Sequence, residues 1–177
     1  MDSDLDIATS NSLVRSARMI RRMRDIEIGV ISDTHDLLRP EAILALEGVD
    51  VIVHAGDVCT PGVLAGLEEI APVHAVRGNN DRGNWALALP ESKTLELGGL
   101  TLHVRHQLHG LDLDPEGAGL GMVISGHSHR PKTAERSGVI YLDPGSAGPR
   151  RGSLPVCIAR VTVDADGVTP RLIVLEA

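Results

Sequence analysis

The stretch that decides the fold is IEIGVISDTH, residues 26–35, in which a mainly apolar run leads directly into a polar loop. A run of this length that is rich in β-branched residues predicts a buried strand. Similar runs end at polar residues in 50–57 and 72–81. Between the runs, 40–46 and 61–70 are predicted helices, because each begins with a proline, which is favoured at the first helical position. Three strand–loop–helix units in succession predict a parallel α/β arrangement.

Each of these predicted strands ends in polar side chains that can bind metals or take part in catalysis. Ligand sites of parallel α/β sheets form at the carboxyl ends of the strands. We therefore expect the following residues to lie close together: Asp33, His35, Asp57, Asn79, Asn80 and Asp81. Taken singly, each has a structural alternative, because Asp and Asn are common in turns and Asp is common at helix N-termini.

After Pro90 the pattern changes to short strand candidates joined by turns that contain Gly, Asp or Pro. The candidates are residues 93–97, 100–106, 121–125, 131–136, 139–142, 155–163 and 170–175. Residues 114–120 are the one weak helix candidate of this half. We expect a second, more antiparallel sheet that packs on the first without a linker.

We expect one domain over residues 25–177, preceded by an extension of residues 1–24. The extension carries five arginines and lacks the apolar segment of a signal peptide. Leu13, Ala17 and Ile20 have helical spacing. The extension is therefore predicted to be flexible or to form a short amphipathic helix.

A pair of histidines follows a further predicted strand in the stretch VISGHSH, residues 123–129. Neutral imidazole is the commonest metal ligand at physiological pH. His127 and His129 are separated by one residue, so in an extended loop their side chains point apart. The pair therefore suits two neighbouring metals better than one.

The donor set of these loops consists of carboxylates, an amide and imidazoles, with no thiolate. Such a mixture suits Mn, Fe or Zn rather than an iron–sulfur or Ca site. The donors are too many for one tetrahedral ion, and two metals that share a carboxylate fit the number better. Paired metals can hold a hydroxide at neutral pH and bind a phosphoryl group during its displacement.

The composition excludes several other classes of function. The net charge is −7, and the aromatic residues are one Trp, one Tyr and no Phe. Strong affinity for nucleic acid is therefore not expected, because it relies on positive charge and aromatic stacking. Apolar runs are too short to cross a membrane. Cys59 and Cys157 are expected to be buried, reduced thiols of a cytoplasmic protein.

The ordered motifs Asp-x-His, Gly-Asp, Gly-Asn-x-Asp, His and Gly-His-x-His resemble those of the calcineurin-like metallophosphoesterases. Within that family they are similar to the small bacterial and archaeal phosphodiesterase branch, as is DPGSAGPR at residues 143–150. The resemblance runs from about residue 26 to the C-terminus. It implies an α/β/β/α sandwich, in which two stacked mixed β-sheets are flanked by helices.

The resemblance also implies two sets of metal ligands around a shared Asp57. One set is Asp33, His35, Asp57 and His129. The other set is Asp57, Asn79, His106 and His127. The cofactors would be two divalent ions, with Mn expected and Fe, Zn or Ni as alternatives.

The central histidine of the second set needs a further argument. If residues 100–106 form a strand, His106 lies on the face opposite to His103 and sits at the strand's end, where the other ligands also lie. His106 is therefore the first choice and His109 the second. His54, His74 and His103 lie within strand runs and are expected to be structural.

The implied activity is that of a phosphodiesterase, in which a hydroxide that bridges the metals attacks phosphorus. His106 and His127 would offset charge in the transition state. Many family members have a leaving-group histidine at the position of Asn80, so this chain should either prefer good leaving groups or take the proton from another donor. Asn80 could instead donate a hydrogen bond to the phosphate. Asp81 is a further catalytic candidate, and Gln107 replaces the usual glycine after the central histidine.

Two other functions compete with this prediction. The first is a protein-binding scaffold on the same fold, like the retromer subunit that resembles these enzymes. The second is a regulatory site with a single metal. As an enzyme, the chain would have a small phosphodiester as its partner, and the sequence leaves open whether it forms a homo-oligomer.

Three further residues or segments have a structural reading. Residues 143–148 are expected to form a structural turn near the site. Arg150 is expected at the surface, with contact to phosphate as the alternative. Trp85 is expected to be a packing anchor.

Overall fold

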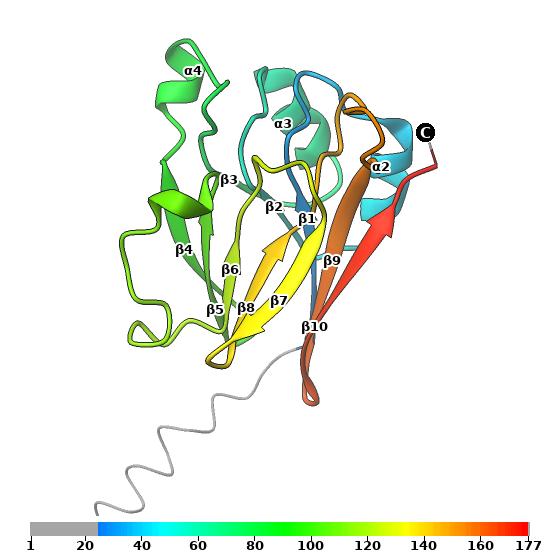
Figure 1. Cartoon of the computed structure of the whole chain (residues 1–177). Helices are drawn as coiled ribbons and strands as arrows, with labels where there is room; N and C mark the ends of the chain where they lie inside the picture. Colours follow the sequence, from blue (N-terminus) through cyan, green and yellow to red (C-terminus); the bar gives the residue numbers. More distant parts are fainter. Residues whose placement is uncertain (1–24, 177) are drawn as a thin grey trace, which may run out of the picture.

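The computed structural model describes residues 25–176, so the predicted extension of residues 1–24 lies outside the described residues. Two five-stranded mixed sheets make up most of the described chain (Figure 1). The first sheet has the order β10-β9-β1-β2-β3. Its strands are β1 (Ile26–Ile31), β2 (Val51–His54), β3 (Val73–Ala75), β9 (Cys157–Asp164) and β10 (Gly167–Val174).

The second sheet has the order β4-β5-β6-β8-β7. Its strands are β4 (Ser92–Leu97), β5 (Leu100–Arg105), β6 (Met122–Ile124), β7 (Lys132–Arg136) and β8 (Val139–Asp143). The predicted sandwich of stacked mixed sheets is confirmed. Two details of the prediction are wrong: β9 and β10 belong to the first sheet rather than the second, and the centre of the second sheet is parallel, because β6 pairs in parallel with both β5 and β8.

The two predicted helices of the N-terminal half are present as α2 (Pro40–Leu46) and α3 (Pro61–Glu68). Each has a proline at its start, as expected from the fixed φ of that residue. The structure adds a short helix α4 (Asn84–Leu87) and a 3₁₀ turn η1 (Leu108–Gly110). The predicted helix at residues 114–120 is wrong, because these residues form turns.

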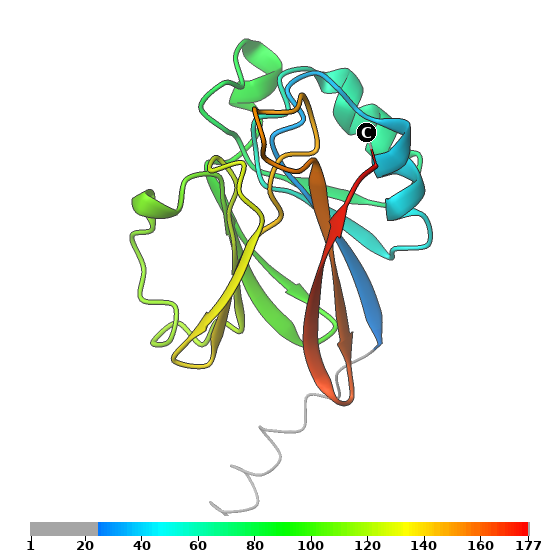
Figure 2. The ribbon, with the colours of Figure 1, turned by 45° about the vertical axis from the view of Figure 1, so that its right-hand side comes forward.

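Two apolar layers hold the elements together. The larger one fills the space between the sheets, where Ile28 and Val30 of β1 meet Leu102 of β5 and Ile124 of β6. The other lies between the first sheet and its helices, with side chains that point away from the second sheet. Figure 2 shows the resulting layers, with α2 and α3 on the outer side of the first sheet.

The outer face of the second sheet is covered differently. Its small apolar cluster of Leu120, Val123 and Val139 packs against Leu113 and Tyr141, which lie on the loop before β6 and on β8. Among residues 25–176, no α-helix contributes to that cluster. This face is therefore more open than the helix-covered face of the first sheet (Figure 2).

The strands place the polar motifs at one end of the sandwich. β1, β2 and β3 are mutually parallel, and so are β5, β6 and β8. The loops that carry the motifs follow these strands at their carboxyl ends, the upper end of the molecule in Figure 1. In the part of the chain that the structure describes, no helix is both long enough and apolar enough to span a membrane.

Candidate metal centre

One group of donors lies between the loops after β1 and β6. Oδ1 of Asp33 is 3.3 Å from Nε2 of His129 and 3.9 Å from Nε2 of His35. The same nitrogen of His35 lies 3.8 Å from Oδ2 of Asp57. Ligands that bind one ion at about 2.0–2.2 Å lie about 3–4 Å apart. Asp33, His35 and His129 therefore have the spacing of a common metal site.

A second group shares the carboxylate of Asp57. Oδ2 of Asp57 lies 3.4 Å from Nε2 of His106, and that nitrogen lies 3.1 Å from Oδ1 of Asn79. The rings of His106 and His127 are in edge contact, with centroids 5.2 Å apart. The structure thus brings together all seven residues expected to bind metal, with Asp57 in contact with members of both groups.

The protons of His106 test whether this second group fits a cation. Nδ1 of His106 is 2.8 Å from the carbonyl oxygen of Ala55, which can only accept, so Nδ1 carries a proton. In the neutral ring Nε2 is then an acceptor, yet it faces the acceptor oxygens of Asp57 and Asn79. Either a second proton or a cation must lie between Nε2 of His106 and these oxygens. Burial lowers the pKa of His106, but the hydrogen bond with Asp57 together with the charges of Asp33 and Asp57 outweighs burial and raises the pKa.

The carboxylate of Asp33 gives an independent test. Its Oδ2 accepts hydrogen bonds from the Ser32 hydroxyl at 2.6 Å and from the His127 amide at 3.0 Å. Its Oδ1 is buried and receives no hydrogen bond from any described residue. A buried carboxylate oxygen without a donor is costly. A divalent cation beside His35 and His129 would satisfy it, so the residues fit such an ion.

Both aspartates are held in the charged form that a metal requires. Burial raises the pKa of Asp33, but the close contact with His129, the hydrogen bond from Ser32 and the charge of His106 together outweigh it and hold the pKa below its usual range. Burial likewise raises the pKa of Asp57, and hydrogen bonds from His106 and Asn80 bring it well below normal. The site therefore carries two carboxylates at neutral pH.

The backbone at the site is in an unusual conformation. Five of the seven residues have φ in the left-handed region, with values of 53° for Asp33, 45° for His35, 56° for Asp57, 69° for His127 and 57° for His129. Residues other than glycine rarely adopt this region, although Asp and His do so more often than most. Such conformations cluster at functional sites, where the surrounding structure enforces them.

Two glycines allow the loops to approach each other. A Cβ atom on Gly78 would overlap the backbone nitrogen and the carboxylate of Asp57. A Cβ atom on Gly126 would overlap the Ser32 hydroxyl and come within 2.7 Å of Oδ2 of Asp33. Any side chain at either position would push a candidate ligand out of place.

The two residues after Asn79 contact the loops rather than the open site. Asn80 donates its amide hydrogen to Oδ1 of Asp57 at 2.8 Å and its side-chain amide to Oδ2 at 2.6 Å. Asp81 is buried, and its carboxylate accepts three backbone amides, from Asp57, Cys59 and Gly78. The geometry gives Asp81 the contacts of a structural side chain and not those of the catalytic role expected from the sequence.

Three residues make contacts at the site that were not expected from the sequence. Nη2 of Arg151 lies 3.5 Å from Nε2 of His35, whereas the sequence offered phosphate contact only as an alternative for the neighbouring Arg150. Gln107 donates its side-chain amide to Oδ1 of Asn79 at 3.0 Å and lies 3.5 Å from His127. The spacing of the motifs does not indicate the contacts of Arg151 or Gln107, because each contact depends on how a loop folds back onto the site.

The third of these residues is Cys59. The prediction that its thiol is buried is wrong, because only Cys157 is buried. Sγ of Cys59 lies 3.6 Å from Nδ1 of His35, on the side of the ring away from the other donors. Burial together with the charge of Asp81 raises the pKa of this thiol to about 11. It is therefore a neutral neighbour of His35.

The remaining predicted histidines lie outside the two groups. His54 is fully buried and bonds to the Thr34 hydroxyl at 3.0 Å and to the Gly56 amide at 3.2 Å. His103 bonds to the Thr94 hydroxyl, and His74 lies 3.3 Å from the amino group of Lys93. His109, the second choice for the central ligand, lines a neighbouring hollow.

The comparisons with known proteins agree with this geometry. Residues 26–166 match the model of the calcineurin-like phosphoesterase superfamily domain. A probable metallophosphoesterase of Methanothermobacter thermautotrophicus is 37% identical over 150 residues, which cover 76% of this chain and 85% of the relative.

Solved structures extend the likeness. A structure of an archaeal phosphodiesterase has a TM-score of 0.69 at 27% identity and covers 85% of this chain and 100% of its own. Vacuolar protein sorting 29 from Cryptosporidium parvum also has a TM-score of 0.69, but at 16% identity it shares the fold alone; the match covers 84% of this chain and 97% of that one. The family match, the curated relative and the site geometry together show that the chain belongs to the calcineurin-like phosphoesterase superfamily.

Proposed function

We propose that the protein is a phosphodiesterase that works with two divalent cations, held on either side of Asp57. The observation that carries this proposal is the position of the Asp57 carboxylate, which lies within 3.8 Å of His35 in one donor group and 3.4 Å of His106 in the other. A carboxylate in this position is placed to bridge two ions.

The residues for each ion follow from the two groups. The first ion would be bound by Asp33, His35, Asp57 and His129. The second would be bound by Asp57, Asn79, His106 and His127. Oxygen and imidazole donors without thiolate favour manganese, with Fe, Zn or Ni as alternatives. When bound, the ions would supply an activated water and would neutralise charge on the phosphoryl oxygens.

The chain's own residues would orient the phosphate. The guanidinium of Arg151 is placed beside His35, where it can donate hydrogen bonds to a nonbridging phosphoryl oxygen. Gln107 can offer an amide donor at the mouth of the site, while Asn80 and Gln107 hold the candidate ligands Asp57 and Asn79 by hydrogen bonds. These donors would stabilise charge that grows on the phosphoryl oxygens as the reaction proceeds.

The reaction is a hydrolysis in which the water oxygen bonds to phosphorus and the P–O bond to one substituent breaks. The departing oxygen must receive a proton or leave as an anion. Asn80 stands where many relatives have a histidine and cannot supply that proton. We therefore infer a preference for substituents that leave as stable anions, such as aryl oxides.

Two hollows beside the site support a diester rather than a monoester. One of about 240 Å³ borders Asn79, His106 and Gln107, and another of about 380 Å³ borders His127. A phosphodiester has two organic substituents, and each hollow is placed to receive one. The similarity to an archaeal phosphodiesterase points in the same direction.

The test is hydrolysis of bis(4-nitrophenyl) phosphate by the metal-loaded protein. Asp57→Ala and His127→Ala should abolish the activity, whereas Asp112→Ala, which changes an exposed carboxylate, should not. Full activity in the first two variants would refute the site assignment. Bound metal without turnover of any phosphodiester would favour the alternative function, a protein-binding scaffold.

We also propose that the protein acts in the cytoplasm. Both cysteines are free, and a reducing compartment keeps such thiols reduced. Secretion into an oxidising compartment with retained activity would contradict this assignment.

A further inference from the structure

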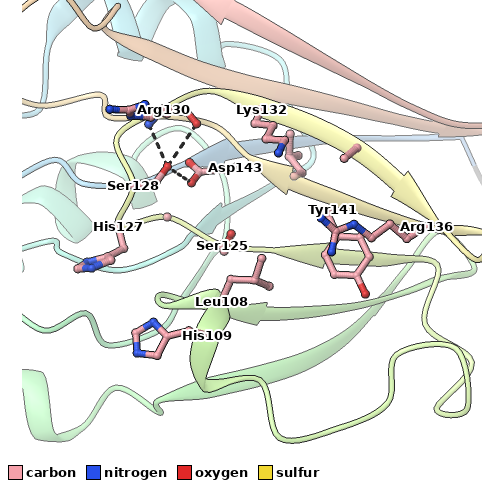
Figure 3. Close-up of a pocket in the computed structure, with 13 residues that line it drawn as sticks. Leu108, His109, Ser125, His127, Ser128, Arg130, Lys132, Arg136, Tyr141 and Asp143 are labelled. Atoms are coloured by element: carbon pink, nitrogen blue, oxygen red, sulfur yellow. Dashed lines mark hydrogen bonds between the residues drawn. The ribbon is translucent and has the colours of Figure 1, made fainter.

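The larger hollow lies on the open outer face of the second sheet and borders the candidate metal centre at His127. Its volume is about 380 Å³, which is within the range of about 300–1,000 Å³ for small-molecule sites. His127 forms one wall of the hollow, and the ring of the same residue contacts His106 of the metal centre. Figure 3 shows His127 at one end of the hollow and Tyr141 at the other.

The floor of the hollow is apolar. Leu108 of η1, Ala134 of β7, and Tyr141 and Leu142 of β8 line it. Leu108 is 40% exposed, which leaves apolar surface uncovered beside the site. Tyr141 is the only tyrosine of the chain, and its ring offers a face for stacking on a planar group.

The rim of the hollow is basic. Arg130, Lys132 and Arg136 line it, and none of them forms an ion pair with a carboxylate within residues 25–176. The guanidinium of Arg136 lies over the Tyr141 ring, 5.5 Å from its centroid. The one acidic residue of the lining, Asp143, is occupied by hydrogen bonds from the Ser128 hydroxyl at 2.6 Å and the Gly145 amide at 2.9 Å.

This excess of positive charge is local, because the whole chain has a net charge of −7. Charges that lack protein partners are available to an anionic ligand. The arginine-rich residues 15–24 are a poor fit for this hollow, since they carry the same charge. A ligand that is both planar and anionic would be complementary to this apolar floor, aromatic face and basic rim.

We propose that this hollow binds one substituent of the phosphodiester substrate, and that the substituent is a planar ring system of nucleoside size that carries a second phosphate. The proposal rests on the proposed phosphodiesterase function. The ring would lie against Tyr141 and Leu108, and the second phosphate would contact the basic rim along β7, between Lys132 and Arg136. The scissile phosphate would sit at the metal centre beside His127.

Three synthetic diesters that release the same 4-nitrophenolate separate these features. They are methyl 4-nitrophenyl phosphate, thymidine 5′-(4-nitrophenyl phosphate), and the 3′-phosphorylated form of the latter. The bond that breaks is the same in each, so differences in kcat/KM report binding of the rest of the molecule. We expect kcat/KM to rise about tenfold with the nucleoside and about tenfold again with the second phosphate.

Two variants assign these gains to the hollow. The double variant Lys132→Gln/Arg136→Gln should lose the gain from the second phosphate and retain the rate on the methyl ester. Ala134→Phe, which fills the floor, should lose both gains. Arg171→Gln is the matched control, since this exposed arginine lies on β10, outside the hollow. Unchanged hydrolysis of the methyl ester shows that each variant is folded and metal-loaded.

Binding of thymidine 3′,5′-bisphosphate, measured by calorimetry, separates the two proposals. Suppose that no diester is hydrolysed but the bisphosphate binds the wild type and not the double variant. The proposal that the hollow binds this ligand is then supported, and the proposed phosphodiesterase function is refuted. If the methyl ester is hydrolysed but the three substrates have equal kcat/KM, or both variants keep the wild-type preference, the hollow proposal is overturned while the function stands. Absence of bisphosphate binding together with absence of turnover overturns both.

Discussion

The backbone amide of Asp57 donates a 3.0 Å hydrogen bond to Oδ2 of Asp81, a residue on the next strand-end loop of the first sheet. The same oxygen accepts the amide of Gly78 at 2.7 Å, and Oδ1 accepts the amide of Cys59 at 2.6 Å. Asp81 therefore fixes the loop that carries the shared ligand Asp57. It acts as a positioning residue, because its carboxylate faces backbone amides and not the open site.

The substitution Asp81→Asn should weaken both folding and metal binding. The side-chain amide has one acceptor oxygen in place of two, so at least one buried amide loses its partner, at a cost of about 1–3 kcal/mol. Urea unfolding of the metal-free protein measures the first effect, and calorimetric titration with Mn²⁺ measures the second. Asp112→Asn, at an exposed carboxylate, is the control. Wild-type affinity for Mn²⁺ in Asp81→Asn would contradict the positioning role.

Removal of metal should lower the melting temperature. Ligand at about 100 times its Kd stabilises the folded state by about 2.7 kcal/mol, which corresponds to about 5–10 °C for a chain of this size. Thermal unfolding with Mn²⁺ and with a chelator measures the difference. Asp57→Ala should reduce it, because this carboxylate contacts both donor groups. An equal shift in the variant would place the stabilising ion elsewhere.

Introducing a proton donor at position 80 should broaden the range of leaving groups. The wild type should hydrolyse methyl 4-nitrophenyl phosphate far faster than methyl phenyl phosphate. In Asn80→His this ratio should fall by about tenfold or more, since general acid catalysis supplies about 10²–10⁴-fold. Asn80→Gln controls for loss of the hydrogen bonds to Asp57. An unchanged ratio in the histidine variant would argue against the proton-donor explanation.

Arg151→Gln should raise KM for the diester more than it lowers kcat. The guanidinium lies 3.5 Å from His35 and is placed to bind the phosphate already in the ground state. We expect a loss of about tenfold in kcat/KM with unchanged affinity for Mn²⁺. Arg171→Gln serves as the control for a general change of surface charge. If only metal affinity falls, Arg151 supports His35 and does not bind substrate.

His54 should make the protein sensitive to acid. Burial lowers its pKa from 6.5 to about 4, even though the nearby carboxylates of Asp33 and Asp57 oppose the shift. The fold thus favours neutral His54, so its contribution is present above pH 6.5 and is lost as the pH falls towards 4. A shift of this size corresponds to about 3 kcal/mol.

Urea unfolding of the metal-free protein at several pH values measures this effect. His54→Gln cannot be protonated, so its stability should decline less steeply between pH 6.5 and 4 than that of the wild type. Comparing the two slopes removes the contribution of the other titrating groups. Parallel slopes would show that His54 does not titrate over this interval.

The sequence predicted the location of the site because the relevant signals are local. Asp33 and His35, Asp57, and Asn79 each follow an apolar run, and the parallel pairing of β1, β2 and β3 brings such strand ends together. The choice of His106 over His103 rested on the alternation of side chains along a strand, and its position at the strand's end made it the first choice ahead of His109. The structure places Nε2 of His106 beside Asp57, in agreement with that argument.

What the sequence did not predict depends on contacts between distant segments. β9 and β10 look like any other strands in the C-terminal half, and nothing in their residues indicates that β9 pairs with β1. The roles of Asp81 and Arg151 likewise depend on the path of a loop. Residues 114–120 carried a weak helical pattern, but two glycines lie within them and the segment forms turns.

The pairing of β1 with β9 has a consequence for biosynthesis. β1 is synthesised long before β9, its second neighbour, which begins only at Cys157. Until then the strand that presents Asp33 has one unpaired edge, which is a site for wrong association. The sheet that aligns the centre therefore cannot form until β9 has been synthesised, and a nascent chain that stalls before Cys157 carries all seven candidate ligands without this sheet.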